Sequence, residues 1–409
     1  MNTVLVFPGQ GSQYVGMGAK LYEEYEIVRQ TFHEADDYLG RNISEIIVEG
    51  SAMKLNRLNN LFPAIFTTSV ALFRLYMSKV GIKPMYLAGH SLGEYSALCC
   101  SGALEFGETL RFVEQRGELI KKVHDPLRGA MTILDGVTQE IVSNAIIKGK
   151  FDGIYIACYN APTQIVVSGL QEQLFEFEQL MIQKGGRVTP LIMSPPIHSR
   201  LVSEVEGEIE RIIEQLQVKE MKYPVISSIS GKLYSSKDQI KPLLKQQICH
   251  PVQWQNVMRF IKEQHTDLIL EIGTNSILTK LTELNVEEMK AYSYGNEQDR
   301  SFLYQFLSLG ITEETLSQFV IECMRNIVCT RNNSTLGEIC NKEISRNYRS
   351  LENILASEHK DMEENRKIAV EVYHTLKRSL EMKEVVESEK KMRLNNIISR
   401  FNLEELFDR

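Results

Sequence analysis

A serine between two glycines is the first feature of this sequence that could do chemistry. The segment Gly89-His90-Ser91-Leu92-Gly93 follows a short apolar stretch ending at Ala88 and precedes a segment of helical character. Glycines at this spacing allow the tight strand-to-helix turn that exposes a serine hydroxyl, and the following helix points free N–H groups at any anion formed there. The pattern predicts that Ser91 is a nucleophile in acyl chemistry, although ordinary strand-to-helix turns with a surface serine share it.

The histidines are the candidates for a base that would activate Ser91. His90 is adjacent to the serine but on the opposite side of the predicted turn. His198 follows two prolines that keep its segment extended. This segment lies where a small inserted unit, described below, should return to the large domain. His250 is the main rival of His198, and composition alone does not separate His198 from a structural histidine. The remaining histidines lie in charged, helical surroundings typical of a surface: His33, His124, His265, His359 and His374.

The composition is that of a globular protein with room for two or three domains. The chain has 409 residues, of which 43% are hydrophobic and 24% charged. A formal net charge of -7 makes nucleic acid and anionic membrane poor candidates for the main partner. Seven cysteines without metal-type spacing indicate reduced thiols and a cytoplasmic location. We expect neither export nor a membrane span, because residues 1–7 lack a leader pattern and charges interrupt the apolar stretch 63–82.

Strands alternate with helices over the first 125 residues. A short apolar strand from Thr3 to Phe7 enters a glycine-rich loop at residues 8–13. Further along, helices are expected at 63–80, 94–101 and 105–124, and a strand at 84–88. This alternation predicts an α/β domain with a parallel sheet.

The next block has a different element order. The sequence predicts strands at 129–134, 153–159, 163–168 and 187–193, with helices at 138–148 and 172–184. This β-α-β-β-α-β order is typical of a ferredoxin-like subdomain. Strands at 224–229 and 268–272 then resume the first pattern up to residue 296, so the small unit is predicted to be inserted into the large one.

From about residue 300 glycine almost disappears, and apolar residues mark helical faces among charges of both signs. This predicts a helical extension that packs on the body or on a partner and takes no part in catalysis. The expected domains are a large α/β domain at 1–127 and 198–296, a ferredoxin-like subdomain at 128–197 and a helical extension at 297–409.

Six segments, in their order along residues 1 to about 296, together resemble the malonyl-CoA:acyl carrier protein transacylase family. They are residues 7–13 (Phe-Pro-Gly-Gln-Gly-Ser-Gln), 89–94 (Gly-His-Ser-Leu-Gly-Glu), 115–117 (Gln-Arg-Gly), 159–162 (Tyr-Asn-Ala-Pro), 197–199 (Ile-His-Ser) and 251–254 (Pro-Val-Gln-Trp). The resemblance implies an α/β-hydrolase-like large domain with a ferredoxin-like insertion. The family includes discrete, trans-acting acyltransferases of polyketide and hybrid peptide–polyketide assembly lines, and the helical tail is similar to that of extended members.

The implied activity is transfer of a malonyl or substituted malonyl group from CoA or a carrier-protein thioester to the phosphopantetheine thiol of an acyl carrier protein. The resemblance makes Ser91 the nucleophile and His198 the base, with the histidine oriented by the backbone carbonyl of Gln247. It places the oxyanion hole at the backbone N–H groups of Gln10 and Leu92. No bound cofactor or metal is implied, and the protein is expected to be a monomer.

The resemblance also implies residues that bind the acyl group. Arg116 would hold the free carboxylate of the substrate by paired N–H bonds, whereas by residue type alone it would be a solvated helix arginine. Asn160 would help to hold the substrate near the cleft, although it could equally form a turn before the Ala161-Pro162 pair. His90, Phe62 and Ile197 are also expected among the substrate-binding residues.

The sequence departs from the family at two positions. Phe62 stands where the family usually has a glutamine, and Ile197 stands where a phenylalanine or serine usually precedes the base. Leu92 is the malonyl-like choice, so the substituent on the acyl group and its donor stay open. Two other functions remain: a proofreading acyl hydrolase, against which Arg116 argues, and a carrier-protein docking protein with weak catalysis that acts through its tail.

Overall fold

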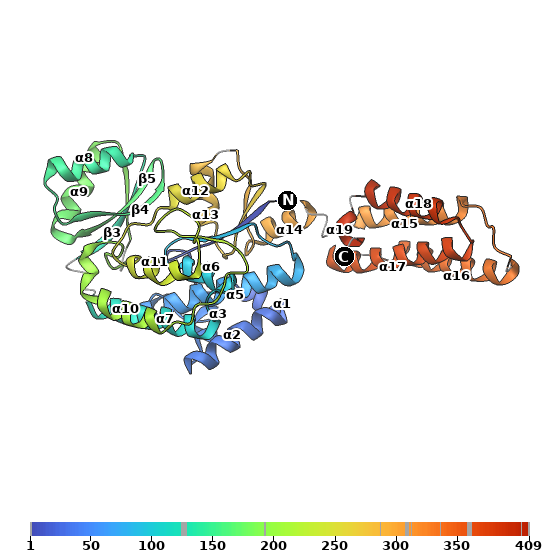
Figure 1. Cartoon of the computed structure of the whole chain (residues 1–409), viewed down its shortest axis with the longest axis horizontal. Coiled ribbons are helices and arrows are strands. Elements are labelled where there is room, and N and C mark those ends of the chain that lie inside the picture. The colour runs from blue at the N-terminus through green and yellow to red at the C-terminus, as the bar shows by residue number, and fades with distance from the viewer. Residues whose placement is uncertain are drawn as a thin grey trace. The chain divides into compact units, whose positions relative to one another are not determined.

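The chain divides into two compact units, Met1–Asp299 and Arg300–Arg409 (Figure 1). The structure is a computed structural model. It describes residues 2–123, 129–191, 194–286, 288–306, 311, 313–335, 337–357, 362–401 and 403–407. The expectations for His124, for His359, for the boundary at 127/128 and for residues 192–193 lie outside the described residues.

A parallel sheet runs through the first unit in the order β7-β2-β1-β8-β9. Its strands are β1 (Thr3–Phe7), β2 (Tyr86–Gly89), β7 (Val225–Ile226), β8 (Leu268–Glu271) and β9 (Ala291–Ser293). Every residue of β1 is buried, as expected for a parallel strand covered on both faces. Phe7 pairs with Gly89, so the loops that follow β1 and β2 leave the sheet at the same edge.

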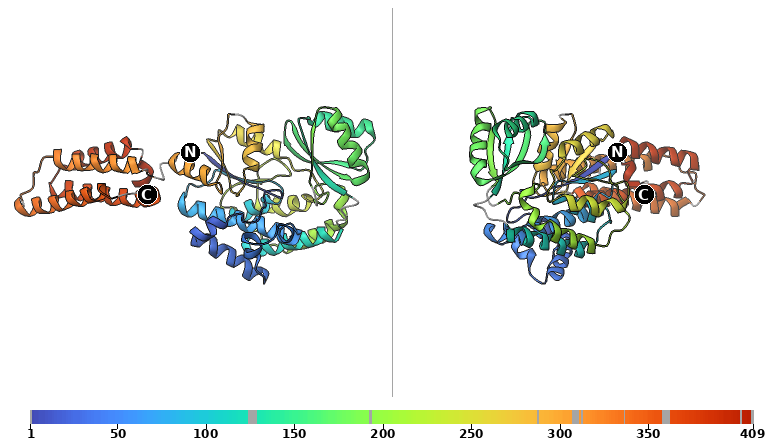
Figure 2. Two further views of the ribbon diagram at one scale, coloured as in Figure 1. Left: turned by 180° about the vertical axis from the view of Figure 1, so that it is seen from behind. Right: turned by 60° about the vertical axis from the view of Figure 1, so that its left-hand side comes forward.

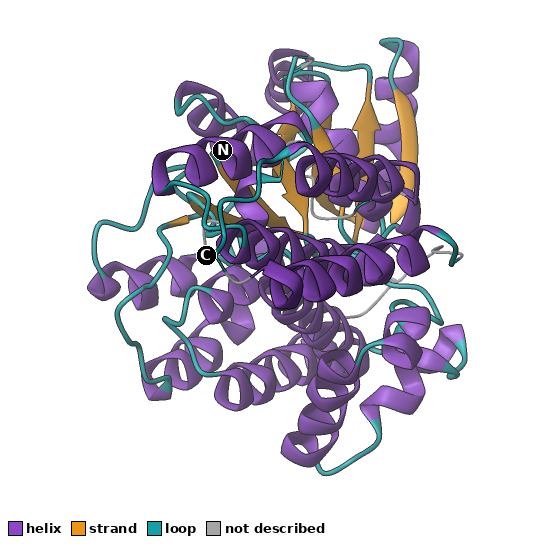
Figure 3. Ribbon diagram, turned by 90° about the vertical axis from the view of Figure 1, so that its right-hand side faces the viewer, coloured by secondary structure: helices purple, strands orange, loops and turns teal. Residues whose placement is uncertain are grey.

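Helices make up most of the chain (Figure 3). Those of the first unit outside its antiparallel sheet are α1 (Ala19–Glu24), α2 (Glu26–Leu39), α3 (Ile43–Val48), α4 (Ala52–Leu55), α5 (Leu58–Lys79), α6 (Gly93–Cys100), α7 (Phe106–Val123), α10 (Glu206–Gln215), α11 (Ile240–Gln246), α12 (Trp254–Glu263) and α13 (Ile277–Asn285), with 3₁₀ turns η1 (Arg200–Val205) and η2 (Lys237–Gln239). Helix α14 (Glu297–Phe306) begins in the last residues of the first unit and continues into the second. Within the described residues, α5 is the one helix long and apolar enough to cross a membrane. However, 78% of its most apolar window is buried inside the protein, so α5 is a core helix.

Two elements differ from the sequence prediction for clear physical reasons. Helix α5 begins five residues earlier than expected, with Pro63 inside it. Proline cannot donate to the carbonyl of Asn59, and that carbonyl instead accepts a 2.7 Å hydrogen bond from Arg41. Strand β7 is only two residues long, because Ser228 turns away from the sheet to donate to a buried carboxylate.

The small subdomain has the predicted β-α-β-β-α-β order. Its elements are β3 (Gly129–Asp135), α8 (Gln139–Gly149), β4 (Ile154–Ala161), β5 (Gln164–Leu170), α9 (Gln171–Gln183) and β6 (Arg187–Leu191). The strands form an antiparallel sheet in the order β4-β5-β3-β6. Both views of Figure 2 show this green segment as a lobe of its own within the first unit. Phe151, Phe177 and Met181 pack in its core.

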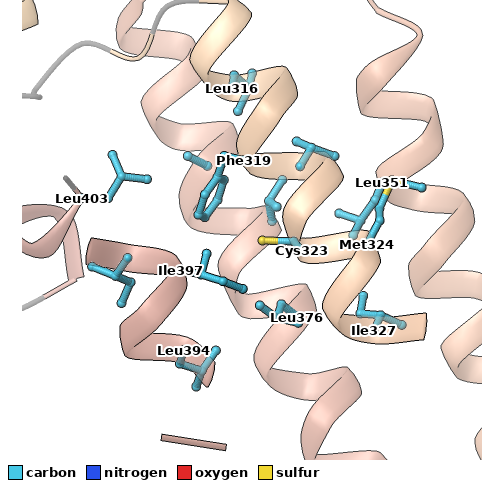
Figure 4. Packing of buried hydrophobic residues seen from close by; sticks show 14 of the residues in the cluster. Leu316, Phe319, Cys323, Met324, Ile327, Leu351, Leu376, Leu394, Ile397 and Leu403 are labelled. Atoms are coloured by element: carbon cyan, nitrogen blue, oxygen red, sulfur yellow. The ribbon is translucent and has the colours of Figure 1, made fainter. Parts of the chain in front are cut away.

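The second unit is helical and has its own core (Figure 4). Its helices are α15 (Glu313–Cys329), α16 (Gly337–Leu355), α17 (Met362–Met382), α18 (Glu387–Arg400) and α19 (Glu404–Phe407). Phe319 of α15, Leu376 of α17 and Ile397 of α18 belong to one cluster of buried side chains. The amphipathic pattern of the sequence therefore reflects packing among these helices.

Candidate active site

Ser91 lies in a turn that only glycine neighbours permit. Its φ of 52° is in the left-handed region, which is costly for a residue with a Cβ. A Cβ on Gly89 would lie 2.0 Å from the carbonyl carbon of Gly93, and one on Gly93 would lie 2.0 Å from the carbonyl oxygen of Phe7. The two glycines thus let β2 pass directly into α6 against the end of β1.

His198 faces the serine hydroxyl. The Nε2 atom of His198 is 2.6 Å from the Oγ atom of Ser91. The Nδ1 atom is 2.8 Å from the backbone oxygen of Gln247 and 3.2 Å from that of His250. Because both Nδ1 neighbours are carbonyls, Nδ1 carries the proton and Nε2 is free to accept one. The ring of His250 is exposed and bonds the Gln246 carbonyl, so the rival histidine contributes only its backbone.

The environment keeps the imidazole neutral. The pKa of His198 is lowered to about 3. Burial is the largest cause, and the positive charge of Arg116 is the second. The carbonyls of Gln247 and His250 act in the opposite direction but do not outweigh burial. The ring is therefore in the form that can take a proton from Ser91.

Two backbone N–H groups lie free on adjacent loops. A Cβ on Gly9 would lie 2.5 Å from the His90 carbonyl oxygen and 3.5 Å from the Leu92 nitrogen, so the glycine-rich loop packs directly on the serine turn. In the part of the chain that the structure describes, neither the Gln10 N–H nor the Leu92 N–H donates a hydrogen bond. The Gln10 side chain anchors its loop by a 2.9 Å bond to Ser194. Such paired donors can stabilise an oxyanion.

Arg116 on α7 is a buried cation. Its side chain is 1% exposed, which excludes the solvated-arginine alternative. The guanidinium lies 5.1 Å from the ring centre of Phe62 and 5.9 Å from that of Tyr95. Its Nη1 and Nη2 atoms have no hydrogen-bond partner among the described residues. Burial lowers its pKa, and the Tyr95 hydroxyl acts in the opposite direction. An unpaired buried cation of this kind is costly unless an anion binds to it.

A cavity of about 360 Å³ joins the serine and histidine to both subdomains. Gln10, Ser91 and His198 line it together with side chains of the antiparallel sheet and α13. Its apolar walls include Met131, Ile133, Val166, Ile197, Ile277 and Leu281. Phe62 and Arg116 are not among the lining residues, and the positive charge of Arg116 lowers the pKa of His198.

His90 and Asn160 form a pair in the same cavity. The Nε2 atom of His90 is 2.8 Å from Oδ1 of Asn160, and the Asn160 amide donates to Gln164 at 2.9 Å. Burial lowers the pKa of His90, whose ring packs 5.4 Å from that of Trp254. Asn160 lies within β4, so it does not form the turn that the sequence left open. The ring of His90 is hydrogen-bonded to Asn160 and does not contact the serine hydroxyl.

Sequence reasoning missed two buried carboxylates, Glu94 and Glu271. Glu94 is fully buried in the first turn of α6. It accepts hydrogen bonds from Ser228, Tyr234 and the side chain of Gln247. A glutamate within an otherwise apolar helix is the signal that could have pointed to it, because glutamate is rarely buried without partners.

The described residues contain no group of three or more His, Cys, Asp or Glu side chains that could hold a metal ion. All seven cysteines are free thiols. Cys158 lines the cavity, and burial raises its pKa to about 12.

Comparison with known proteins gives one consistent result. The model of the acyl transferase domain family matches residues 4–306. The malonyl CoA-acyl carrier protein transacylase of Bacillus subtilis strain 168 is 32% identical over 305 residues, which are 74% of this chain and 96% of the relative.

Solved structures agree. A malonyl-transacylase in complex with its type II polyketide synthase acyl-carrier protein is 32% identical, with a TM-score of 0.71 over 73% of this chain and 97% of that one. An acyl carrier protein S-malonyltransferase from Vibrio cholerae is 31% identical, with a TM-score of 0.71 over 74% and 100% of the two chains. The predicted fold class, an α/β-hydrolase-like domain with a ferredoxin-like insertion, is confirmed. By sequence and by structure, the chain belongs to the acyl transferase domain family and is an acyltransferase of the malonyl-CoA–acyl carrier protein transacylase type.

Proposed function

We propose that the protein moves a malonyl-type acyl group from a thioester donor to the phosphopantetheine thiol of an acyl carrier protein, through an acyl-serine. The observation that carries this proposal is the buried guanidinium of Arg116, whose two Nη groups have no hydrogen-bond partner among the described residues and whose charge lowers the pKa of His198. A planar guanidinium can bind a carboxylate by two parallel hydrogen bonds. Acyl groups with a free carboxylate are therefore the class of substrate that this site favours.

In the first half of the reaction, Ser91 Oγ attacks the thioester carbonyl carbon while His198 Nε2 takes its proton. The oxyanion that forms is stabilised by the N–H groups of Gln10 and Leu92, at about 3 kcal/mol for each well-placed donor. The carbon–sulfur bond then breaks. The leaving thiolate takes the proton from His198, and the acyl group remains as an ester on Ser91.

In the second half, the thiol of the carrier-protein phosphopantetheine occupies the position of the first thiol. It gives its proton to His198 Nε2 and attacks the ester carbonyl. The carbon–oxygen bond breaks, and Ser91 recovers its proton from His198. The Gln247 carbonyl holds Nδ1–H in place throughout, so the ring changes charge without changing tautomer.

The neighbouring side chains set which acyl groups fit. The Phe62 ring supports the guanidinium by a cation–π contact where a polar side chain could have bonded it. Ile197 adds an apolar wall to the cavity, and the pair of His90 and Asn160 lies where it can hold the thioester arm. We propose malonyl or a substituted malonyl as the transferred unit, with CoA or a carrier protein as donor and with no bound cofactor.

The proposed substrates also suggest where in the cell the protein acts. CoA thioesters and carrier proteins are met in the cytoplasm, which agrees with seven free thiols. We propose a cytoplasmic monomer that acts on carrier proteins of fatty-acid or polyketide assembly. Neither nucleic acid nor a membrane takes part in this scheme.

Intact-mass measurement after mixing with malonyl-CoA or acetyl-CoA tests the proposal. The wild-type chain should gain the mass of one malonyl group, and Ser91→Ala should gain none. Arg116→Ala should lose about 3 kcal/mol, or about 100-fold, in kcat/KM for malonyl loading, because two charge-assisted hydrogen bonds disappear. Its preference should shift toward acetyl groups.

Arg116→Lys is the matched control, since lysine keeps the charge but cannot bind a carboxylate with a planar pair of donors. It should recover only part of the loss. Malonyl mass on Ser91→Ala would disprove the acyl-serine, and an unchanged malonyl preference in Arg116→Ala would disprove the carboxylate contact. Release of free malonate faster than transfer to a carrier protein would instead identify a hydrolase.

A further inference from the structure

A buried carboxylate that the proposed mechanism does not use lies behind the serine and histidine. Glu94 is 0% exposed and follows Ser91 by three residues. It accepts four hydrogen bonds, from Ser228 N at 3.0 Å, Ser228 Oγ at 2.7 Å, Tyr234 OH at 2.7 Å and Gln247 Nε2 at 2.8 Å. All four donors are neutral groups. A buried glutamate held in this way is fully hydrogen-bonded, with about four lone-pair positions occupied.

Gln247 connects this carboxylate to both reacting side chains. Its Nε2 group has two hydrogens, and they go to Oε2 of Glu94 and to the backbone oxygen of Ser91, the latter at 3.1 Å. The backbone oxygen of the same residue accepts the Nδ1–H of His198. Gln247 is completely buried. The carbonyl that orients the histidine therefore belongs to a residue whose side chain is fixed by Glu94.

We propose that Glu94 is a positioning residue for acyl transfer: it fixes Gln247, and Gln247 in turn holds the ring of His198 and the turn at Ser91. This inference rests on the proposed function. In a serine-histidine-aspartate triad the carboxylate contacts the histidine directly. Here the Gln247 carbonyl contacts the ring, and the carboxylate acts one residue further away.

The partners of the four hydrogen bonds to Glu94 distinguish a positioning role from a contribution to the stability of the core alone. Three of the four bonds join Glu94 to Ser228 and Tyr234, which make no contact with the serine or the histidine in the described structure. Only the bond to Gln247 leads to the reacting groups. Loss of the Tyr234 hydroxyl should thus destabilise the core while the Gln247 side chain stays bonded to Glu94. A substitution of Glu94 should instead leave the Gln247 side chain free to move.

Single-turnover loading of the full-length protein with malonyl-CoA provides the test. Glu94→Gln keeps the volume but presents an amide N–H₂ group to the donor of Gln247. We expect the maximal loading rate to fall by up to about 100-fold, as for a displacement of about 1 Å in a reacting group, with the half-saturating malonyl-CoA concentration unchanged. Tyr234→Phe, the matched control, should lose a comparable amount of thermal stability and load near the wild-type rate.

Proton NMR supplies a readout that does not depend on turnover. The hydrogen-bonded Nδ1–H of His198 should give a resonance that is absent in His198→Gln. It should persist in the wild type and in Tyr234→Phe and should broaden or vanish in Glu94→Gln. Glu94→Asp, which keeps the carboxylate on a shorter arm, should recover part of the resonance and part of the rate.

If Glu94→Gln does not fold, Gln247→Met replaces it, because methionine keeps the backbone carbonyl but lacks the amide. A wild-type loading rate and resonance in either variant would overturn the inference, as would equal losses in Glu94→Gln and Tyr234→Phe. Failure of the wild type to load at all would overturn the proposed function instead. The Nδ1–H resonance would then still decide whether Glu94 positions the histidine.

Discussion

His198 contributes to the pH dependence of both the activity and the stability of this protein. Its pKa is lowered to about 3 by burial first and the charge of Arg116 second, whereas an ordinary histidine titrates near 6.5. The imidazole proposed as the base is thus already unprotonated throughout the neutral range. We expect kcat/KM for malonyl loading to show no acid limb near pH 6.5 when it is measured from pH 5 to 8.

The sign of the stability effect follows from the same shift. Between about pH 3 and 6.5 the unfolded chain binds a proton at this residue and the folded chain does not, so acidification favours unfolding. The contribution is at most about 1.4 kcal/mol per pH unit. Urea unfolding at pH 7 and pH 5 should show a smaller acid loss for His198→Gln than for the wild type. An acid limb at pH 6.5, or equal losses in both proteins, would contradict the neutral buried ring.

Motifs that resemble those of the transacylase family predicted much of this site, and burial explains what they left out. Ser91, His198 and the Gln247 carbonyl were expected together, and the structure brings them within hydrogen-bonding distance. Sequence could not show that Arg116 is enclosed by aromatic rings. Nor could it show that Glu94 and the Gln247 side chain are bonded, because their separation of 153 residues is closed only by the fold.

At the scale of elements, the tight fit between β1 and the start of α6 is the feature most open to test. Gly93→Ala would place a Cβ 2.0 Å from the Phe7 carbonyl oxygen, which is backbone and cannot move aside. We expect it to lower the free energy of unfolding by about 3 kcal/mol or more and to abolish malonyl loading. Chemical denaturation and intact mass would measure both.

Gly207→Ala on α10 is the matched control for this substitution. A Cβ there meets nothing within 4 Å, and alanine favours helix over glycine by about 1 kcal/mol. This variant should therefore be at least as stable as the wild type and fully active. A stable, active Gly93→Ala would show that α6 can shift away from β1 without cost.

Element boundaries were predicted less well than element order. The sequence placed the strands of the antiparallel sheet and all strands of the parallel sheet except β9 in the observed succession, because buried strands and amphipathic helices have distinct periods. The prediction missed the early start of α5. The Asn59 carbonyl, which Pro63 cannot bond, accepts a hydrogen bond from Arg41 on another loop, and the local sequence does not reveal this contact. The prediction overextended β7, because the bonds from Ser228 to Glu94 are invisible in local sequence.

At the scale of the whole molecule, all the candidate site residues belong to Met1–Asp299, and the family match ends at residue 306. We therefore expect a chain shortened to residues 1–306 to stay folded and to form the acyl-serine at the rate of the full chain. Thermal unfolding and intact mass would check this. Insolubility of the shortened chain would show that the body needs the tail for packing.

The tail itself can be tested inside the full chain. Phe319 is completely buried in the tail core, so Phe319→Ala should destabilise that unit by about 3 to 5 kcal/mol. Malonyl loading should be unaffected. If the shortened chain still loads malonyl but transfers it more slowly to a carrier protein, the tail serves docking. If loading and transfer both persist, the tail is needed for neither step.

The thiol of Cys158 bears on the fidelity of the whole cycle. It lines the same cavity as Ser91, and its pKa of about 12 leaves only about one thiolate in 100,000 molecules at pH 7. Since the thiolate is the nucleophilic form, burial keeps this second potential nucleophile of the cavity unreactive. In the proposed acyl-serine cycle, transfer of the acyl group to the protein's own sulfur is therefore suppressed, and the ester reacts with a thiol that comes from outside.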